Sequence, residues 1–382
     1  MSSTHETRDI QPLRVAEMCT IFGMGGIARH TLGLGAWLKD RGHRIYLSGS
    51  AGDWINEGDF DGFLPIDTLK VGAEGGSIAR RLGHLVRSAW LLRKFLKEKQ
   101  IEVIHAHESA PALVALIARA GLGIPLIVTY HGSDPDRTKG FGAIAKHADQ
   151  VVTPSFRAAD DLEKIGGVPS EKLQVIGLGI DPAPNDLPDD VAALRAELLK
   201  DGDRLVVTIA RLAYQKGIDI LIDCVVRLKQ SHPGYRFVVI GDGPLEHEMR
   251  ELADEKGVDS HLHFAGRNDR PFRVLRAADL MLLTSRWEAL PISIVEAFQT
   301  GTPVVATDCS GVRQLVDDTV GACVPIGDVD AITNAVTSIL EDAARRQEMG
   351  DNALKRSKED RFDPDHINRQ FENLYAKVRH RG

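Results

Sequence analysis

The chain has 382 residues, of which 43% are hydrophobic and 26% charged, and its formal net charge is −7. At about 150 residues per domain this predicts two domains or slightly more, and the composition excludes a disordered, collagen-like or disulfide-scaffold chain. An acidic chain is also not expected to bind nucleic acid generally, because such proteins usually carry a basic surface.

The first half of the chain alternates short apolar runs with longer amphipathic segments. Its first twenty residues lack the apolar core of a signal peptide, and no apolar stretch approaches the roughly 18–20 residues of a membrane span. The apolar runs predict buried strands at 13–19, 45–48, 103–106, 126–130, 151–153 and 173–176, and the segments between them predict helices such as 27–40 and 110–120. This alternation is typical of a parallel sheet with helices on both faces.

A stretch rich in proline and aspartate, DPAPNDLPDD at 181–190, interrupts the alternation. Proline lacks a backbone donor, so the stretch cannot continue a helix or a central strand, and we interpret it as an interdomain linker. The alternation then resumes, with strands predicted at 205–210, 237–240, 262–265, 280–284 and 304–307, helices at 218–230 and 245–256, and a last helix at 365–379.

Two parallel α/β sheets in series predict two Rossmann-like, doubly wound domains that face each other across a cleft. We expect an N-terminal domain at 1–182, a C-terminal domain at 183–360 and a closing helix at 361–382. Ligands of such sheets bind beyond the carboxyl ends of the strands, so we expect functional residues where strands end.

Glycines follow the first predicted strand, in the segment FGMGGIA at 22–28. Glycine lets the backbone approach a ligand closely, and the amides of the next helix can face an anion. A nicotinamide-dinucleotide site would also need an acid at the end of the second strand, about 20 residues on. Because Asp53 lies beyond that strand, we favour contact of Gly25 and Gly26 with a phosphate or substrate. A dinucleotide site and a structural turn are the alternatives.

Two cations five positions apart, Arg211 and Lys216, lie between a predicted strand and the following helix. Arginine can bind a diphosphate through two hydrogen bonds while lysine adds a point charge, so the pair suits a nucleoside diphosphate. The alternative is a pair of solvated surface cations.

Two glutamates eight positions apart form the next candidate site. Glu288 lies in a loop after a strand that ends at Ser285, and Glu296 lies in the first two turns of a helix that begins near Ile292. Both carboxylates can therefore face one ligand, where they would accept hydrogen bonds from sugar or ribose hydroxyls. The alternative is that both acids are simply solvated.

Several short motifs occur together in the order and spacing of a known family. They are GGI at 25–27, VIHAH at 103–107, TYHG at 129–132, GID at 179–181, Arg211 with Lys216-Gly217, GDGP at 241–244, and the pair Glu288 and Glu296. Over nearly the whole chain, these motifs resemble the retaining glycosyltransferases of family 4. The resemblance implies GT-B architecture, which consists of two Rossmann-like domains.

The resemblance also implies a role for each matching residue of the second half. Arg211 and Lys216 would hold the nucleotide diphosphate, and Glu296 would bind the ribose. Glu288 would bind the donor sugar together with the amides of the loop that follows it, which includes Leu290.

In the first half, the resemblance places His131 beside the donor sugar, and the Gly25-Gly26 loop against phosphate or acceptor. Histidines at strand ends are more often hydrogen-bonded structural residues, and we interpret His105 and His107 in that way.

No metal ion or other cofactor is expected. Asp134-Pro135-Asp136 resembles a D-x-D metal motif, but we interpret it as a turn that contains proline. The two cations at 211 and 216 already neutralise a diphosphate.

The segment 78–100 predicts a basic amphipathic helix, in which lysines and arginines far outnumber acids. Such a helix can bind an anionic membrane surface. A helix packed on the first domain with a solvated face explains the same pattern.

The sequence thus predicts a cytoplasmic, retaining, metal-independent glycosyltransferase, with possible peripheral contact with the inner face of the membrane. Its substrates would be a nucleoside diphosphate sugar, with UDP preferred, and a hydroxyl acceptor for polysaccharide, glycolipid or glycoside synthesis. The alternatives are a nucleotide-sugar epimerase of the same architecture, a nicotinamide-dependent dehydrogenase and a non-catalytic sugar-binding protein.

Overall fold

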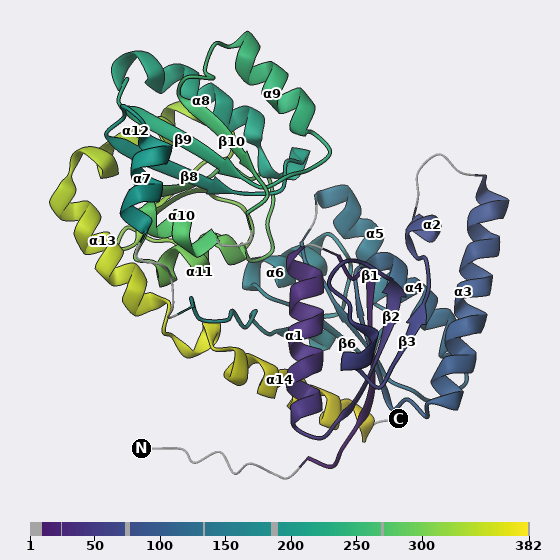
Figure 1. Ribbon diagram of the computed structural model, residues 1–382. Helices are drawn as coiled ribbons and strands as arrows, with labels where there is room; N and C mark the ends of the chain where they lie inside the picture. The colour runs from purple at the N-terminus through teal and green to yellow at the C-terminus, as the bar shows by residue number, and fades with distance from the viewer. Residues whose placement is uncertain are drawn as a thin grey trace, which may run out of the picture. The chain divides into compact units, whose positions relative to one another are not determined.

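The computed structural model describes residues 10–380 except Met24, 73–76, Ser133, 185–189 and 269–270. The chain divides into two compact units, of which the first comprises Met1–Gly179 and Pro364–Gly382, and the second Ile180–Asp363. Each unit is built on a parallel sheet with helices on both faces (Figure 1). The prediction of two Rossmann-like α/β domains is therefore confirmed.

The sheet of the first unit has the strand order β3-β2-β1-β4-β5-β6-β7, and every neighbouring pair is parallel. Its strands are β1 (Arg14–Ile21), β2 (Arg44–Ser50), β3 (Gly62–Pro65), β4 (Val103–His107), β5 (Leu126–Thr129), β6 (Gln150–Thr153) and β7 (Leu173–Val175). The strand order changes direction between β1 and β4, and at such a point the loops on either side separate and leave room for a ligand.

Two layers of helices cover this sheet. One face packs against α3 (Ile78–Glu98), α4 (Ser109–Ala118), α5 (Pro135–Ala145) and α6 (Phe156–Lys164), and the other against α1 (Gly26–Asp40) and α14 (Pro364–Arg379). The remaining helical pieces are α2 (Leu69–Gly72), η1 (Glu57–Asp59) and η2 (Ser170–Lys172). Successive strand residues alternate between the two cores, so the side chains of Leu13, Val15 and Cys19 all face α1 and α14.

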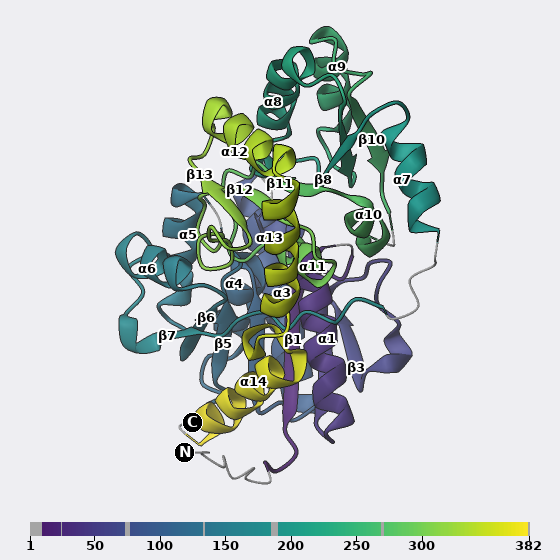
Figure 2. The ribbon, with the colours of Figure 1, turned by 90° about the vertical axis from the view of Figure 1, so that its left-hand side faces the viewer.

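The C-terminal helix α14 belongs to the first unit, although it follows the second in sequence. Figures 1 and 2 both show α14 beside α1, and the indole of Trp37 on α1 donates a hydrogen bond of 2.9 Å to Asp365. Farther along α14, Glu372 accepts hydrogen bonds from Arg41 and His43. The predicted helix at 365–379 is thus present, and its position completes the core of the first sheet.

The sheet of the second unit has the order β10-β9-β8-β11-β12-β13, again with parallel neighbours. Its strands are β8 (Arg204–Ile209), β9 (Tyr235–Ile240), β10 (Leu262–Gly266), β11 (Leu280–Leu283), β12 (Val304–Thr307) and β13 (Gly321–Val324). Its helices are α7 (Val191–Leu199), α8 (Ile218–Ser231), α9 (Glu246–Glu255), α10 (Pro271–Ala277), α11 (Ile292–Gln299), α12 (Val329–Glu341), α13 (Ala343–Arg356), η3 (Tyr214–Lys216) and η4 (Asp360–Phe362). The change of direction lies between β8 and β11, which are the two strands that precede the predicted nucleotide site.

Among the described residues, no helix is long and apolar enough to cross a membrane.

Candidate functional site

In the second unit, the loops that follow β8 and β11 are held against each other by a glycine. Gly217 ends η3 with a φ of 61°, and a Cβ built on it would lie 2.2 Å from the carbonyl oxygen of Thr284. Any side chain would therefore force the two loops apart. The hydroxyl of Thr284 donates a 2.8 Å hydrogen bond to the carbonyl oxygen of Gly217, which closes the same contact.

Further contacts connect the two loops beyond Gly217. The backbone N–H of Arg286 donates to the carbonyl oxygen of Gln215 at 2.7 Å, and the Gln215 amide donates to the carbonyl oxygen of Trp287 at 2.9 Å. The Arg286 guanidinium forms an ion pair with Asp219 and stacks 4.0 Å from the ring centre of Tyr214. These contacts hold both loops in place before a ligand arrives.

Lys216 and Glu288 form an ion pair at this junction. The Lys216 ammonium donates to the Glu288 carboxylate, which also accepts a 2.7 Å hydrogen bond from the hydroxyl of Ser285. The two side chains are only 19% and 7% exposed, so the charges are largely shielded from water. The sequence predicted a ligand role for each residue separately, whereas the structure brings the two charges together.

The other predicted residues of this site lie on the same loops or on the helix that follows. Arg211 comes two residues after β8 and its side chain is exposed, while Glu296 is buried in the second turn of α11. Leu290 is also buried, in the loop before α11. The backbone of Gly311 packs directly against that loop, since a Cβ on Gly311 would lie 1.9 Å from the carbonyl oxygen of Ala289.

In the first unit, the predicted glycine loop lies at the start of α1. Gly25 precedes the helix with a φ of 154°, Gly26 is its first residue, and both are exposed. Among the residues that the structure describes, a Cβ on Gly25 would meet nothing within 4 Å, which leaves room for a ligand to approach the backbone there. Asp53 lies in the loop beyond β2, as the sequence predicted, and its side chain is exposed.

His131 follows β5, is itself half-buried and contacts a cluster of buried polar side chains. Its Nε2 lies 3.0 Å from Nδ1 of His107, and Nε2 of His107 lies 3.2 Å from a carboxylate oxygen of Glu17 on β1. Nδ1 of His105 lies 3.1 Å from the same carboxylate, which also accepts a 2.7 Å hydrogen bond from the Tyr375 hydroxyl of α14. As predicted, His105 and His107 are buried and hydrogen-bonded.

The cluster has strongly shifted pKa values. Burial alone would raise the pKa of the Glu17 carboxyl, but the charge of His105 and the hydrogen bonds from His105 and His107 hold this pKa well below its usual range. Burial, reinforced by His105, lowers the pKa of His107 to about 4. Burial and then His107 lower the pKa of His131 well below its usual value. His107 and His131 are therefore neutral at pH 7.

Sequence reasoning did not single out Glu17 or Tyr375. Glu17 could have been noticed, because it is an acid in the middle of the apolar run of a predicted buried strand. Nothing in the sequence indicated that Tyr375, which lies 358 positions away, would reach it.

The residues Glu17, His105 and His107 also have the composition of a metal-binding group, with ligand atoms within 4.8 Å of one another. In the structure these atoms are engaged in hydrogen bonds, and His105 Nε2 lies 2.6 Å from the hydroxyl oxygen of Thr129. The D-x-D segment has a different role from the predicted turn, because Asp134 caps α5 by accepting a 3.0 Å hydrogen bond from the N–H of Arg137. The expected absence of a metal stays a prediction.

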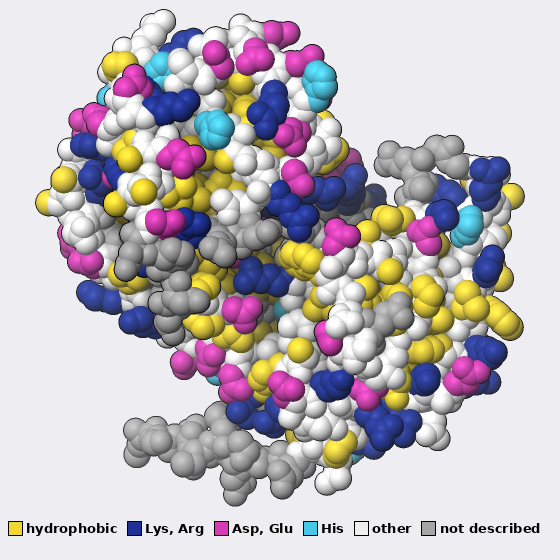
Figure 3. All heavy atoms as spheres, viewed as in Figure 1, with side chains coloured by type: hydrophobic (Ala, Val, Ile, Leu, Met, Phe, Trp, Pro, Cys, Tyr) yellow, Lys and Arg dark blue, Asp and Glu magenta, His cyan; other side chains and the backbone are white. Residues whose placement is uncertain are grey.

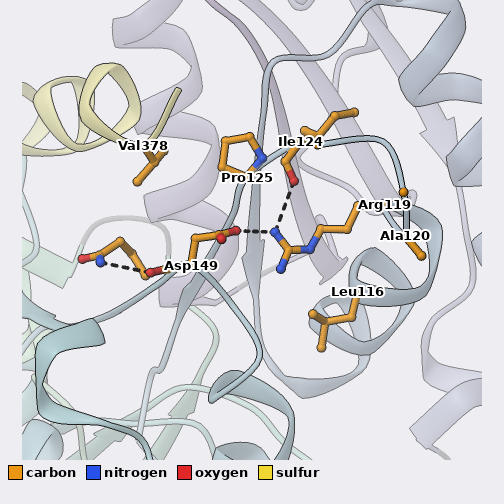
Figure 4. A pocket seen from close by; sticks show the side chains of 10 residues that line it. Leu116, Arg119, Ala120, Ile124, Pro125, Asp149 and Val378 are labelled. Atoms are coloured by element: carbon orange, nitrogen blue, oxygen red, sulfur yellow. Dashed lines mark hydrogen bonds and ion pairs between the residues drawn. The ribbon is translucent and has the colours of Figure 1, made fainter. Parts of the chain in front are cut away.

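A cavity of about 490 Å³ lies elsewhere in the first unit (Figure 4). It is lined by residues that precede β5 and β6, such as Pro125 and Asp149, and by Val378 of α14. In Figure 4, Arg119 reaches Asp149 and the carbonyl oxygen of Ile124 across it. The cavity is at the amino ends of the strands, opposite to the edge where parallel sheets bind ligands, so we do not assign it to the active site.

Known proteins with similar sequences are glycosyltransferases. Alpha-D-kanosaminyltransferase of Streptomyces kanamyceticus is 28% identical over 69% of this chain and 75% of its own. Phosphatidyl-myo-inositol mannosyltransferase of Mycolicibacterium smegmatis is 29% identical over 93% of this chain and 90% of its own.

Solved structures support the same architecture. Anabaena HepE, crystallised with UDP and glucose, superimposes with a TM-score of 0.80 over 95% of this chain and 99% of its own, at 21% identity. WaaG, a glycosyltransferase involved in lipopolysaccharide biosynthesis, gives a TM-score of 0.76 over 94% of this chain and 99% of its own, at 16% identity. These similarities show the fold and favour neither an epimerase nor a dehydrogenase.

Two family models match the chain in succession. The model for Glycosyltransferase Family 4 matches residues 24–184, and the model for glycosyl transferases group 1 matches residues 190–356. The chain therefore belongs to glycosyltransferase family 4 and is a glycosyltransferase of GT-B architecture.

Proposed function

We propose that this glycosyltransferase transfers a sugar from a UDP-linked donor to a hydroxyl acceptor, with retention of configuration and without a metal ion. The observation that carries the proposal is the shielded Lys216 ammonium, held by Glu288 where the strand order of the second sheet changes direction. The names of similar proteins support UDP as the carrier. One is a UDP-Gal-dependent galactosyltransferase of Escherichia coli, 26% identical over 67% of this chain, and HepE was also crystallised with UDP-glucose.

The main chemical task at this site is to stabilise the leaving group. As the bond from the sugar to the phosphate breaks, negative charge develops on the diphosphate while the sugar becomes oxocarbenium-like. Arg211 can bind the diphosphate through two hydrogen bonds. The ammonium of Lys216 has three N–H donors, so it can bind phosphate oxygens while one donor stays on Glu288.

The family resemblance supplies the other contacts in this proposal. Glu296 binds the ribose hydroxyls, and Glu288 binds the donor sugar together with backbone amides near Leu290. Gly25 and Gly26 contact phosphate or acceptor. The acceptor is a hydroxyl of a cell-envelope polysaccharide, a glycolipid or a smaller glycoside.

Retention follows if the acceptor attacks from the face that the diphosphate leaves. The acceptor oxygen forms its bond to the anomeric carbon as the bond to the phosphate oxygen breaks, and the acceptor proton passes to that departing oxygen. No covalent sugar–enzyme bond is needed. Trapping of a glycosyl adduct on Glu288 would contradict this route.

Alanine substitutions test the diphosphate contacts. Lys216→Ala and Arg211→Ala should each weaken UDP binding and lower kcat by about 10²-fold, which is typical for loss of one preorganised donor. Lys256→Ala is the matched control, because its ammonium also pairs with a carboxylate, that of Asp223, but on an exposed surface of the same unit. Unchanged kinetics in both site variants would exclude this role.

A thermal-shift screen with UDP, GDP, ADP and their sugars tests the choice of carrier. A ligand that binds only the folded protein raises its apparent stability. We expect the largest shift with UDP and UDP-sugars, and a larger shift with GDP or ADP would overturn the choice of UDP.

We further propose that the exposed part of α3 docks on an anionic membrane. The C-terminal half of α3 packs on the sheet, but Ile78, Leu82, Val86 and Trp90 are 57–82% exposed at a spacing of four residues. Figure 3 shows dark blue Lys and Arg side chains together with yellow apolar ones along the flank that α3 occupies. An apolar row beside cations is typical of helices that lie in the surface of an anionic bilayer.

Sedimentation with vesicles tests this docking. The chain should sediment with vesicles rich in phosphatidylglycerol at low salt, and high salt should release it. Leu82→Gln combined with Trp90→Gln should abolish sedimentation without changing UDP binding, while Ile117→Gln, an exposed apolar side chain on α4, is the control. Absence of sedimentation of the unaltered chain at low salt would exclude the proposal.

A further inference from the structure

A chain of hydrogen bonds leads from the buried carboxylate of Glu17 to the ring of His131. It crosses neighbouring strands, because Glu17 lies on β1, His107 on β4, and His131 just after β5. The two links measure 3.2 Å from Glu17 to His107 Nε2 and 3.0 Å from His107 Nδ1 to His131 Nε2. Glu17 and His107 have no exposed surface, so water does not compete for the hydrogen bond between them.

The chemistry of the groups sets the direction of each bond. An ionised carboxylate only accepts hydrogen bonds, so Nε2 of His107 must carry the proton that it donates to Glu17. In a neutral imidazole the other nitrogen is then an acceptor, and Nδ1 of His107 accepts from Nε2 of His131. By the same rule Nδ1 of His131 has no proton. Among the described residues, that nitrogen has no hydrogen-bonding partner.

Other donors hold the carboxylate in its ionised, acceptor-only state. The Tyr375 hydroxyl donates to Glu17 at 2.7 Å, and Nδ1 of His105 lies 2.6 Å from that hydroxyl oxygen and 3.1 Å from the carboxylate. Burial raises the pKa of Tyr375 well above its usual value, so this hydroxyl keeps its proton. The neutral state of His107 and His131 is consistent with the lowered pKa of each ring.

We propose that Glu17 acts through His107 as a positioning residue that holds His131 in its Nε2–H tautomer, so that Nδ1 accepts a hydrogen bond from a hydroxyl of the donor sugar. This inference rests on the proposed function for the identity of the ligand. It deepens that function by defining the substrate class: the donor must present a hydroxyl to His131. A carbonyl or carboxylate oxygen in that place would face the lone pair of Nδ1 and could not form a hydrogen bond with it. A deoxy sugar would leave Nδ1 without a partner.

Imidazole nitrogen NMR of the unliganded chain tests the tautomer directly. In ¹⁵N–¹H long-range correlation spectra, His107 and His131 should both show the Nε2–H pattern at pH 7. This measurement needs neither a donor nor a variant. The Nδ1–H pattern at His131 would overturn the proposal.

Glu17→Gln tests the role of the carboxylate. The glutamine amide can donate to His107 Nε2, which would reverse both bonds and place a proton on Nδ1 of His131. We expect loss of the single Nε2–H pattern and a decrease in kcat of at least 10-fold, with the Kd for UDP unchanged. Tyr375→Phe is the matched control, since it removes another donor to Glu17 but leaves the link to His107, and it should keep the wild-type tautomer. An unaltered tautomer and kcat in Glu17→Gln would contradict the proposal, as would loss of the tautomer in Tyr375→Phe.

Deoxy analogues of the donor connect the tautomer to specificity. The analogue that lacks the hydroxyl bound by His131 should react at least 10-fold more slowly than the parent sugar. This difference in rate should shrink in Glu17→Gln, because Nδ1 of His131 then no longer accepts a hydrogen bond from either sugar. Equal differences in both proteins would contradict the specificity role. If no UDP-sugar reacts while His131 shows the Nε2–H pattern, the proposed donor is wrong. The positioning of His131 by Glu17 through His107 would still be supported.

Discussion

Gly217 and Gly257 have the same positive φ in very different surroundings, and this contrast allows the architecture of the nucleotide site to be tested. Both have a φ of 61°. A Cβ on Gly217 would lie 2.2 Å from the carbonyl oxygen of Thr284 and 3.1 Å from a side-chain carbon of Ile220, whereas on Gly257 its nearest neighbour would be the Lys229 ammonium, 3.7 Å away. Substitution by alanine therefore adds the same backbone strain at both sites but a steric clash only at Gly217.

The expected magnitudes follow from this difference. A left-handed conformation costs a residue with a Cβ about 1–2 kcal/mol, which is the whole expected loss for Gly257→Ala. Overpacking adds about 1–3 kcal/mol, so Gly217→Ala should lower the free energy of unfolding by about 2–5 kcal/mol. Because the clash separates the loops that carry Lys216 and Glu288, Gly217→Ala should also weaken UDP binding.

Urea denaturation followed by circular dichroism, together with UDP titration of each variant, measures both effects. Equal destabilisation by the two substitutions would show that the close approach of Gly217 to Thr284 does not matter. Weaker UDP binding in Gly257→Ala would show that the loss is not specific to the junction of β8 and β11.

Two further predictions concern the loop before α11 and the buried histidines. Gly311→Ala should lower kcat more than it weakens UDP binding, because its Cβ would lie 1.9 Å from the carbonyl oxygen of Ala289, in the loop assigned to the donor sugar. Steady-state kinetics and a UDP titration measure the two effects. An unchanged kcat would contradict the assignment of this loop. Burial lowers the pKa of His107 to about 4 and that of His30 to about 3, so between these values and about 6.5 the unfolded chain binds more protons than the folded one. The free energy of unfolding should therefore fall as the pH falls from 7 to 5, and an equal or higher urea midpoint at pH 5 would contradict the buried, neutral state of these rings.

Most of the fold could be predicted, because continuous apolar strands that alternate with amphipathic helices leave few architectures open. The strands missed were β3 and β13. Both lie at sheet edges, and their sequences, GFLP and GACV, contain a proline or a glycine that weakens the strand pattern. At Gly321 the glycine has a packing reason, since a Cβ would lie 1.8 Å from the carbonyl oxygen of Val304.

The sequence could locate the loops of the candidate site, but not the pairing of the side chains on them. Strand ends and spacing located Lys216 and Glu288, yet their ion pair depends on how two loops 72 residues apart meet. The link from Glu17 to Tyr375 joins the first strand to the last helix, and no local pattern reports a contact of that range. For the same reason, the sequence could predict α14 as a helix but not the sheet on which it packs.

The central claim is that Arg211 and Lys216 receive the diphosphate of the donor. A crystal structure of the chain with UDP bound tests it most directly. We expect both phosphate groups at the carboxyl ends of β8 and β11, within hydrogen-bonding distance of the Arg211 guanidinium and the Lys216 ammonium. Phosphate density beyond the reach of both side chains would contradict the account.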